Sequence, residues 1–231
     1  MNTLNATFRG IAALTVVLGL VLLGACSDGG GGNNNGGGLA PADDPADDGR
    51  NQVLVEAGAD FQTRVLEALI GAAPGDTIVL PEGEFDLDTP LSLDVDNVHI
   101  VGQGQDKTVL NFAQQGSGGE SVRVTANNVV LEDFAVIDPP SDGIKFKFSN
   151  GVTMRGMRVE WTCGSCEENG AYGLYPVQTE NVLIEDCIVI GASDAGVYVG
   201  QSDKIIVRRN TVSLNVAGIE IENSTNSEVY D

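Results

Sequence analysis

The segment Asp194-Ala195-Gly196-Val197-Tyr198-Val199 decides the fold of this chain, because close variants of it recur along the sequence. The variants are Ser141-Asp142-Gly143-Ile144-Lys145-Phe146, Ala171-Tyr172-Gly173-Leu174-Tyr175-Pro176 and Val216-Ala217-Gly218-Ile219-Glu220-Ile221. Each variant places a glycine before two apolar residues that flank one polar or aromatic residue. The four glycines follow one another at intervals of 30, 23 and 22 residues. Self-similarity at such a period indicates a solenoid, in which each repeat contacts only its neighbours.

The repeats alternate apolar and polar residues with period two, which is typical of strands. A second recurring segment, represented by Asn128–Leu131, Asn181–Ile184 and Lys204–Val207, runs in register with the first. Short strands that return every 22 or 23 residues predict the successive rungs of a parallel β-helix.

Aligning the repeats predicts which side chains stack in the core. The predicted inward columns are Ile100, Leu131, Met154, Ile184, Val207 and Val229; Phe134, Met157, Cys187 and Asn210; Val136, Val159, Val189 and Val212; and Ile144, Leu174, Val197 and Ile219. Each rung would add a few aliphatic side chains to one continuous core, so burial between neighbouring rungs stabilises the fold.

Residues 1–25 are predicted to be a signal peptide, since Arg9 precedes an apolar run that is short for a membrane span. The run ends in Leu23-Gly24-Ala25-Cys26, which resembles the bacterial lipobox. This resemblance implies cleavage before Cys26 and lipidation of that residue. Because Ser27 and not an aspartate follows, the resemblance also implies an outer-membrane location in a bacterial cell envelope. The alternative is an ordinary secretory signal with a chance cysteine.

Residues 26–52 are rich in Gly, Asn, Pro and Asp and are predicted to form a flexible tether. Residues 53–231 are predicted to form the β-helix domain, in which an amphipathic helix over residues 60–72 caps the first rung. No similar cap follows the last repeat, so we expect the chain to be a fragment that is truncated at its C-terminus.

The composition restricts the partners, because 33 acidic and 12 basic residues give a formal charge of −21. Nucleic acid is excluded, since phosphate binding needs a basic face. In an oxidising envelope, Cys163 and Cys166 are predicted to form a local disulfide, and Cys187 is predicted to be buried. With one histidine in the chain, no metal site and no cofactor are predicted. A divalent cation attracted to the acidic surface remains an open alternative.

Two departures from the bare repeat mark the candidate binding residues. The first is the 30-residue repeat, whose extra residues around Glu160–Gly170 contain Trp161, the single tryptophan. Insertions in repeat proteins lie on one face, often the binding face, so we expect Trp161 to be exposed.

The second departure is an outward row of side chains that period two places on the solvent side of successive rungs. Its members are Lys145, Tyr175, Tyr198 and Glu220, with Tyr172 on the intervening rung and Asp142 and Asp194 at the rim. Stacked tyrosines flanked by charges predict a flat surface of the kind against which sugar rings lie. The alternative is that the row is cross-rung stacking and the Trp161 loop is a disulfide-pinned excursion, neither with a ligand.

Four arginines are predicted to lie on the outside, and each could neutralise a uronate or balance the acidic surface. They are Arg155, Arg158, Arg208 and Arg209.

Residues 170–231, which begin GAYGLYPVQTENVLIEDCIVIGASDAGVYVG, resemble a bacterial family of uncharacterised parallel β-helix repeat lipoproteins, as the lipobox also does. Members of this family are often encoded beside a c-type cytochrome-like protein. Residues 74–150 are more distantly similar to right-handed β-helices of the pectate-lyase and mannuronan-epimerase type. These resemblances imply an all-β fold, a right-handed parallel β-helix with an N-terminal capping α-helix. Asp138-Pro139-Pro140-Ser141 lacks the His and Glu of the epimerase motif Asp-Pro-His-Glu, so no catalytic residue is carried over.

The leading hypothesis is an envelope-anchored lipoprotein that binds or modifies an extracellular or envelope polysaccharide. The alternative is a non-enzymatic scaffold that docks a partner protein in the periplasm or outer membrane. As an enzyme, the chain would be a polysaccharide lyase or uronate epimerase, in which Tyr175 or Tyr198 is the base and Lys145 neutralises the carboxylate. Glu220 is a further weak candidate for a catalytic residue.

Overall fold

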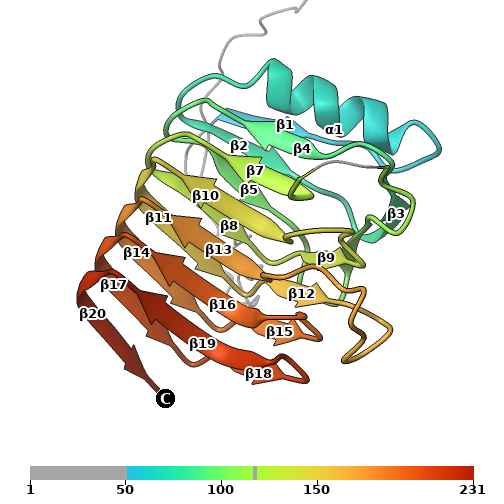
Figure 1. Cartoon of the computed structure of the whole chain (residues 1–231). Coiled ribbons are helices and arrows are strands. Elements are labelled where there is room, and N and C mark those ends of the chain that lie inside the picture. The colour runs from blue at the N-terminus through green and yellow to red at the C-terminus, as the bar shows by residue number, and fades with distance from the viewer. Residues whose placement is uncertain (1–50, 117–118) are drawn as a thin grey trace, which may run out of the picture. The chain divides into compact units, whose positions relative to one another are not determined.

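The computed structural model describes residues 51–116 and 119–231, which form a parallel β-helix of three sheets (Figure 1). The predicted signal peptide, Cys26 and the tether up to residue 50 lie outside the described residues. The first strand begins at Asn51, two residues before the predicted start of the domain. Within the described ranges, no helix is long and apolar enough to cross a membrane.

Sheet A holds eight parallel strands and runs the whole length of the described solenoid. Its strands are β1 (Asn51–Leu54), β2 (Asp76–Val79), β5 (His99–Val101), β8 (Val129–Glu132), β11 (Asn150–Arg155), β14 (Glu180–Glu185), β17 (Asp203–Arg208) and β20 (Thr225–Tyr230).

Sheet B holds six shorter parallel strands. They are β3 (Gly83–Asp86), β6 (Thr108–Asn111), β9 (Ala135–Ile137), β12 (Arg158–Glu160), β15 (Ile188–Ile190) and β18 (Thr211–Ser213).

Sheet C also holds six parallel strands, and it carries the predicted outward row. Its strands are β4 (Leu91–Leu93), β7 (Val122–Val124), β10 (Ile144–Lys147), β13 (Leu174–Val177), β16 (Ala195–Gly200) and β19 (Ala217–Glu222).

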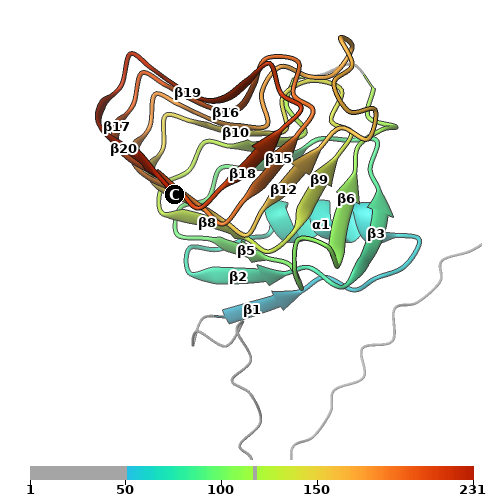
Figure 2. The same ribbon diagram turned by 90° about the horizontal axis from the view of Figure 1, so that it is seen from below.

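The predicted register is confirmed by the strand pairing. In sheet A, Leu131 pairs with Met154, Met154 with Ile184 and Ile184 with Val207. In sheet B, Val159 lies between Val136 and Val189, and in sheet C, Leu174 lies between Ile144 and Val197. These side chains are buried in one core. Figure 2 shows how the strands of the three sheets surround the axis of the solenoid.

Two of the three corners of each later rung are turns of constant length. From β8 onward, two residues separate each strand of sheet A from the next strand of sheet B, as Asp133 and Phe134 do. Two residues also separate sheet C from sheet A, as Phe148 and Ser149 do. The connection from sheet B to sheet C varies, and the 30-residue repeat carries its extra length there, between Glu160 and Leu174.

The helix α1 (Phe61–Ile70) covers the first rungs, as the sequence predicted. It buries Phe61, Val65 and Leu69 against β3 and β4, and the ring of Phe61 stacks on that of Phe85 with centroids 3.8 Å apart. Apolar surface at this end of the core is thereby removed from water.

Replacing Ile184 by alanine tests the column register. Ile184 is fully buried between Met154 and Val207, so we expect Ile184→Ala to lower the free energy of unfolding by about 2–5 kcal/mol. Chemical denaturation followed by circular dichroism measures this loss. Ile70→Ala, at an exposed helix position, is the control and should change stability by less than about 0.5 kcal/mol. Equal effects of the two substitutions would contradict the assigned core.

Candidate functional site

A row of outward side chains crosses sheet C in register. Arg123 on β7 pairs with Lys145 on β10, and Lys145 pairs with Tyr175 on β13. Further along, Tyr198 on β16 pairs with Glu220 on β19. The structure therefore places the predicted row on one wall of the solenoid and extends it by Arg123.

Three tyrosine side chains meet at the middle of this row, and we call Tyr172, Tyr175 and Tyr198 the tyrosine cluster. The centroid of the Tyr172 ring lies 4.7 Å from that of Tyr175 and 4.6 Å from that of Tyr198, and the Tyr175 and Tyr198 centroids are 5.2 Å apart. All three side chains are half-buried. Tyr172 comes from the connection before β13, so a loop residue completes a surface that two strands begin.

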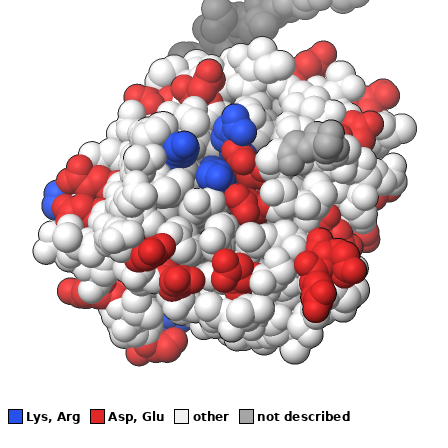
Figure 3. Space-filling view, in the orientation of Figure 1, with Lys and Arg blue, Asp and Glu red and all other residues white. Residues whose placement is uncertain are grey.

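Cationic side chains border the tyrosine cluster on the side of β7 and β10. The Lys145 Nζ lies 4.3 Å from the centroid of the Tyr175 ring and 3.4 Å from Asp142 Oδ2. Arg123 forms an ion pair with Glu120, and its own side chain is 54% exposed. Figure 3 shows Lys and Arg side chains gathered beside Asp and Glu side chains on this face. Two ion pairs, Lys145 with Asp142 and Arg123 with Glu120, thus lie next to the aromatic surface with their cations on it or beside it.

The pKa values of the two carboxyl groups at this border shift in opposite directions from their ordinary values. Burial raises the pKa of Asp142 above its ordinary value, although Lys145 opposes the shift. Burial acts in the same direction on Glu120, but the hydrogen bond and charge of Arg123 hold its pKa below the ordinary value.

Acidic side chains border the tyrosine cluster on the other side. Burial, followed by the nearby Asp194 carboxylate, raises the pKa of Tyr172 to about 12. The Tyr198 hydroxyl donates a hydrogen bond to the Glu222 carboxylate, which raises the pKa of Tyr198 as well. Both hydroxyl groups stay protonated near neutral pH and act as hydrogen-bond donors. This geometry argues against Tyr198 as a general base.

The expectation that Trp161 is an exposed contact residue is wrong. Its side chain is only 3% exposed, and its Nε1–H donates a hydrogen bond to the Pro139 carbonyl oxygen at 2.7 Å. The start of the long connection continues the strand path, since the Trp161 backbone N–H bonds to the Ile190 carbonyl oxygen. The indole therefore fills the core under the loop and does not belong to the candidate site.

The rest of the long connection is tied down before it reaches Tyr172. Cys163 and Cys166 are joined by a disulfide, and the Asn169 side-chain amide donates to the carbonyl oxygens of Gly164 and Gly191, each at 2.6 Å. These bonds fix the loop on the neighbouring rung. Cys187 is a buried free thiol, and burial raises its pKa to about 12.

Sequence reasoning missed Glu120, Arg123 and Glu222. The segment Val122-Arg123-Val124 has the same alternation as Ile144-Lys145-Phe146, and extending the alternation of β19 by one step reaches Glu222. These two signals were present in the sequence. Glu120 lies before its strand in a non-periodic connection, so the repeat gave no indication of its position. Within the described ranges, no group of three or more His, Cys, Asp or Glu side chains could hold a metal ion.

Residues 95–231 match the protein family described as the right handed beta helix region. This match covers more than half of the chain and includes every repeat used to predict the fold. The chain belongs to this family. No curated protein matches the sequence.

Solved structures of polysaccharide-active enzymes share the right-handed β-helix. The A-module of Azotobacter vinelandii mannuronan C-5 epimerase AlgE6 has a TM-score of 0.59 and 19% identity, over 75% of this chain and 51% of that one. The A-module of the mannuronan C-5 epimerase AlgE4 from the same organism has a TM-score of 0.56 and 18% identity, and the match covers 73% of this chain and 55% of that one. An alginate lyase from Paenibacillus sp. str. FPU-7 has a TM-score of 0.50 and 18% identity, and the match covers 73% of this chain and 62% of that one. The chain thus spans about half the length of the two epimerase modules, and the likeness establishes the fold.

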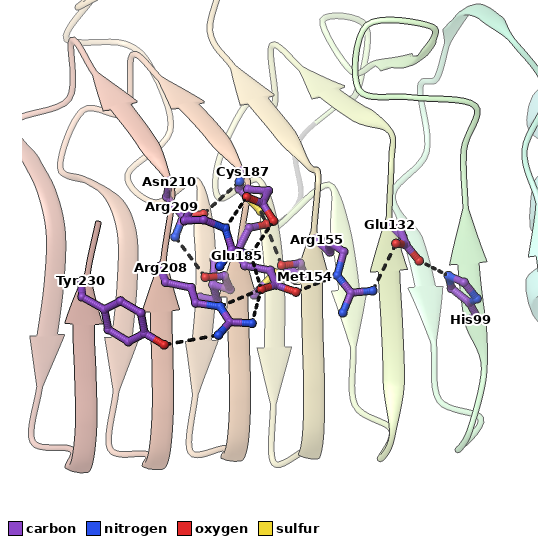
Figure 4. Close-up of polar contacts among 12 residues, drawn as sticks. His99, Glu132, Met154, Arg155, Glu185, Cys187, Arg208, Arg209, Asn210 and Tyr230 are labelled. Carbon is purple, nitrogen blue, oxygen red and sulfur yellow. Dashed lines mark hydrogen bonds and ion pairs between the residues drawn. The ribbon is translucent and has the colours of Figure 1, made fainter. Parts of the chain in front are cut away.

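The four arginines predicted to face solvent form ion pairs with carboxylates of the same chain. Figure 4 shows these contacts for Arg155, Arg208 and Arg209. Glu185, whose side chain is 5% exposed, accepts hydrogen bonds from Arg155 at 2.7 Å, Arg208 at 2.8 Å and Arg209 at 2.7 Å. Arg155 also bonds to Glu132, and Glu132 lies 2.9 Å from His99.

Arg158 likewise forms ion pairs with Glu160 and Asp106. None of the four arginines lies in the row on sheet C, and their pairing favours the interpretation that they balance acidic neighbours.

Glu185 gives this network a pH dependence. Burial by itself would raise the pKa of Glu185, but the three guanidinium groups lower it to about 2. A carboxyl group whose pKa is depressed on folding contributes stability above its unfolded pKa of about 4.3, and that contribution is lost as the pH falls toward 2.

We expect Glu185→Gln to destabilise the protein at pH 7, and the gap to the wild type to narrow steadily below about pH 4. Urea denaturation across this pH range measures the gap. Glu167→Gln, at an exposed position, is the control and should follow the wild type throughout. A gap for Glu185→Gln that is independent of pH would contradict the assigned ion pairs.

Proposed function

We propose that this chain binds an extracellular or envelope polysaccharide that contains uronate units, through the tyrosine cluster and the charges beside it on sheet C. The observation that carries the proposal is the contact of three tyrosine rings with one another, next to Lys145 and in register with Arg123. This combination joins an apolar surface to positive charge on one exposed wall.

The tyrosine cluster fits the amphipathic character of sugars. Sugar rings have apolar faces that pack on aromatic rings and hydroxyl groups that accept and donate hydrogen bonds. The hydroxyl groups of Tyr172 and Tyr198 stay protonated as donors. Successive strands lie about 4.8 Å apart, so the row offers a contact to each of several consecutive sugar units.

The cationic border favours an acidic sugar. Lys145 lies over the Tyr175 ring, and the Arg123 side chain reaches solvent on the next rung. A carboxylate placed there would meet an ammonium and a guanidinium group. Asp142 lies on the same Lys145 ammonium, and burial raises its pKa above the ordinary value.

The named activities of similar folds agree with this ligand class. Two of the structural neighbours are mannuronan C-5 epimerases and a third is an alginate lyase. Their identities are 18–19%, so they support a polysaccharide ligand and transfer no residue to this chain.

The same geometry supports catalysis of the lyase or epimerase type as an extension of the proposal. Both reactions begin with abstraction of the proton α to the uronate carboxyl group. We assign the role of base to Tyr175, because Lys145 lies over its ring and would meet the carboxylate of a sugar bound there. Glu220 stands at the acidic border of the row and is not placed to neutralise a carboxylate.

The anchoring of this protein is proposed on the sequence alone. Lipidation of Cys26, an outer-membrane location and the alternative of a scaffold that docks a partner protein remain predictions of the sequence. A partner protein that covers the tyrosine cluster would be recovered with the lipoprotein from detergent-solubilised membranes, in stoichiometric amount and without saccharide affinity.

Removing two rings of the tyrosine cluster tests the binding proposal. We expect Tyr175→Ala combined with Tyr198→Ala to weaken binding to alginate or polygalacturonate by about ten- to a hundredfold, since each ring contributes about 0.5–1.5 kcal/mol. Native gel electrophoresis through gels that contain either polymer measures the affinity. Tyr230→Ala, an exposed tyrosine on β20, is the control and should bind as the wild type does. Equal retardation of all three proteins would refute the assigned surface.

A separate measurement tests the catalytic extension. If Tyr175 is the base, incubation with alginate or polygalacturonate yields an unsaturated uronate, detected by ultraviolet absorbance, or a C5-inverted uronate, detected by proton NMR. Tyr175→Phe should lower this rate by about 10²–10⁴-fold while retaining most of the binding. Absence of both products from the wild-type protein across the pH range would leave binding as the function.

A further inference from the structure

A second row of side chains lies one corner away from the tyrosine cluster. Phe148, Gln178, Gln201 and Asn223 each follow directly after a strand of sheet C, and we call these four residues the turn row. All four side chains are exposed, and all four backbones are left-handed, with φ between 50° and 58°. The turn row therefore repeats one conformation on four consecutive rungs.

Phe148 is anomalous in the turn row. A bulky residue with positive φ is an outlier, whereas asparagine tolerates this conformation well. The Phe148 side chain is 65% exposed, so core packing does not explain its presence. The other three rungs have amides at the same position, so the turn itself does not require an aromatic ring. The Lys147 Nζ, 4.9 Å from the ring centroid, is the cation–π contact of this ring.

The amide groups of the turn row are free to bind. Elsewhere at this side of the solenoid, stacked amides bond to each other: Asn128 Nδ2 donates to Asn97 Oδ1 at 3.1 Å, and Asn181 Nδ2 donates to Asn150 Oδ1 at 2.8 Å. The structure gives no such bond, among the residues it describes, to the side chains of Gln178, Gln201 or Asn223. The turn row is thus an unused set of donors and acceptors, in contrast to the bonded asparagines.

These side chains border a groove of about 700 Å³. Its opposite side is formed by polar side chains at the start of β11, β14 and β17, among them Asn150, Glu180 and Asp203. Between the two sides lie Ser149, Thr179 and Ser202, whose side chains are buried. The buried hydroxyl groups are bonded within the protein, as Thr179 and Ser202 are to each other. The exposed ring and the free amides along one groove match what a hydroxyl-rich ligand needs.

Charge distinguishes this groove from the tyrosine cluster. Glu180 and Asp203 line it, and Glu222 precedes Asn223 in the chain. Lys204 is paired with Glu180. A polyanion would meet these carboxylates and be repelled, whereas an uncharged sugar chain would not.

We infer that the turn row is a second binding surface, which holds a neutral polysaccharide against the Phe148 ring and the free amides of Gln178, Gln201 and Asn223. One rung separates successive members by about 4.8 Å, comparable to the length of one sugar unit. Each member of the turn row lies three residues further along its rung than Lys145, Tyr175, Tyr198 or Glu220, and the two surfaces are tested separately below.

The test uses Phe148→Asn, which introduces the residue type found at position 223 of the same turn. Because asparagine suits the left-handed backbone better than phenylalanine, this variant should keep or raise the unfolding temperature while it loses the ring. Leu214→Asn is the matched control, since Leu214 is also exposed and left-handed, with φ 59°, but lies on the connection between sheets B and C.

The probes are soluble barley β-glucan, glucomannan, galactomannan and arabinoxylan in native affinity gels, with alginate in a parallel gel. We expect at least one neutral polymer to retard the wild type and Leu214→Asn equally. Phe148→Asn, and separately Gln178→Ala with Gln201→Ala, should weaken that retardation about five- to tenfold. The Tyr175→Ala, Tyr198→Ala variant should keep it.

Three results would overturn the inference: no neutral polymer retards the wild type, Phe148→Asn binds as tightly as the wild type, or loss of the tyrosines abolishes the neutral binding. Alginate binding in the parallel gel depends on the tyrosines, so failure of the uronate proposal is distinguished from failure of this one.

Discussion

The structure depends on the alignment of equivalent residues one above another in successive rungs. Parallel hydrogen bonding holds Leu131, Met154, Ile184 and Val207 in one column, and similar columns run through the other two sheets. Each apolar side chain is buried mainly by its counterparts above and below, so stability accumulates from one rung to the next. A shift of one residue in any rung would turn its apolar side chains outward.

The same alignment organises the outside of the molecule into rows. On sheet A it produces alternating charges, in which Glu132, Arg155, Glu185 and Arg208 follow one another in register. On sheet C it produces the sequence Arg123, Lys145 and Tyr175, continued by Tyr198 and Glu220. The first row satisfies its charges internally, and the second leaves aromatic surface half-exposed. This difference separates a structural row from a candidate binding surface.

The sequence was informative wherever side chains follow the repeat. Period two and the recurring glycines predicted the inward columns and the placement of Lys145, Tyr175, Tyr198 and Glu220 on one wall. The amphipathic pattern of residues 60–72 predicted the capping helix. The burial of Trp161 was missed because the sequence analysis assigned this residue to the insertion. Trp161 lies two residues after the inward Val159, and its backbone continues the path of β12. The partners of the arginines were missed for another reason: period two assigns Glu185 to the outside, and only the three guanidinium groups around it remove it from water.

The corners of the rungs divide the protein into a constant and a variable part. From β8 onward, two corners take two residues each, and the third accepts connections of very different length without disturbing the strands beside it. Tyr175 and Tyr198 belong to the constant part, whereas Tyr172 and the disulfide belong to the variable one. Replacing the connection between sheets B and C would therefore change the residues beside the tyrosine cluster and leave the strands intact. Sequence variation, natural or engineered, can accumulate at this third corner without loss of the solenoid.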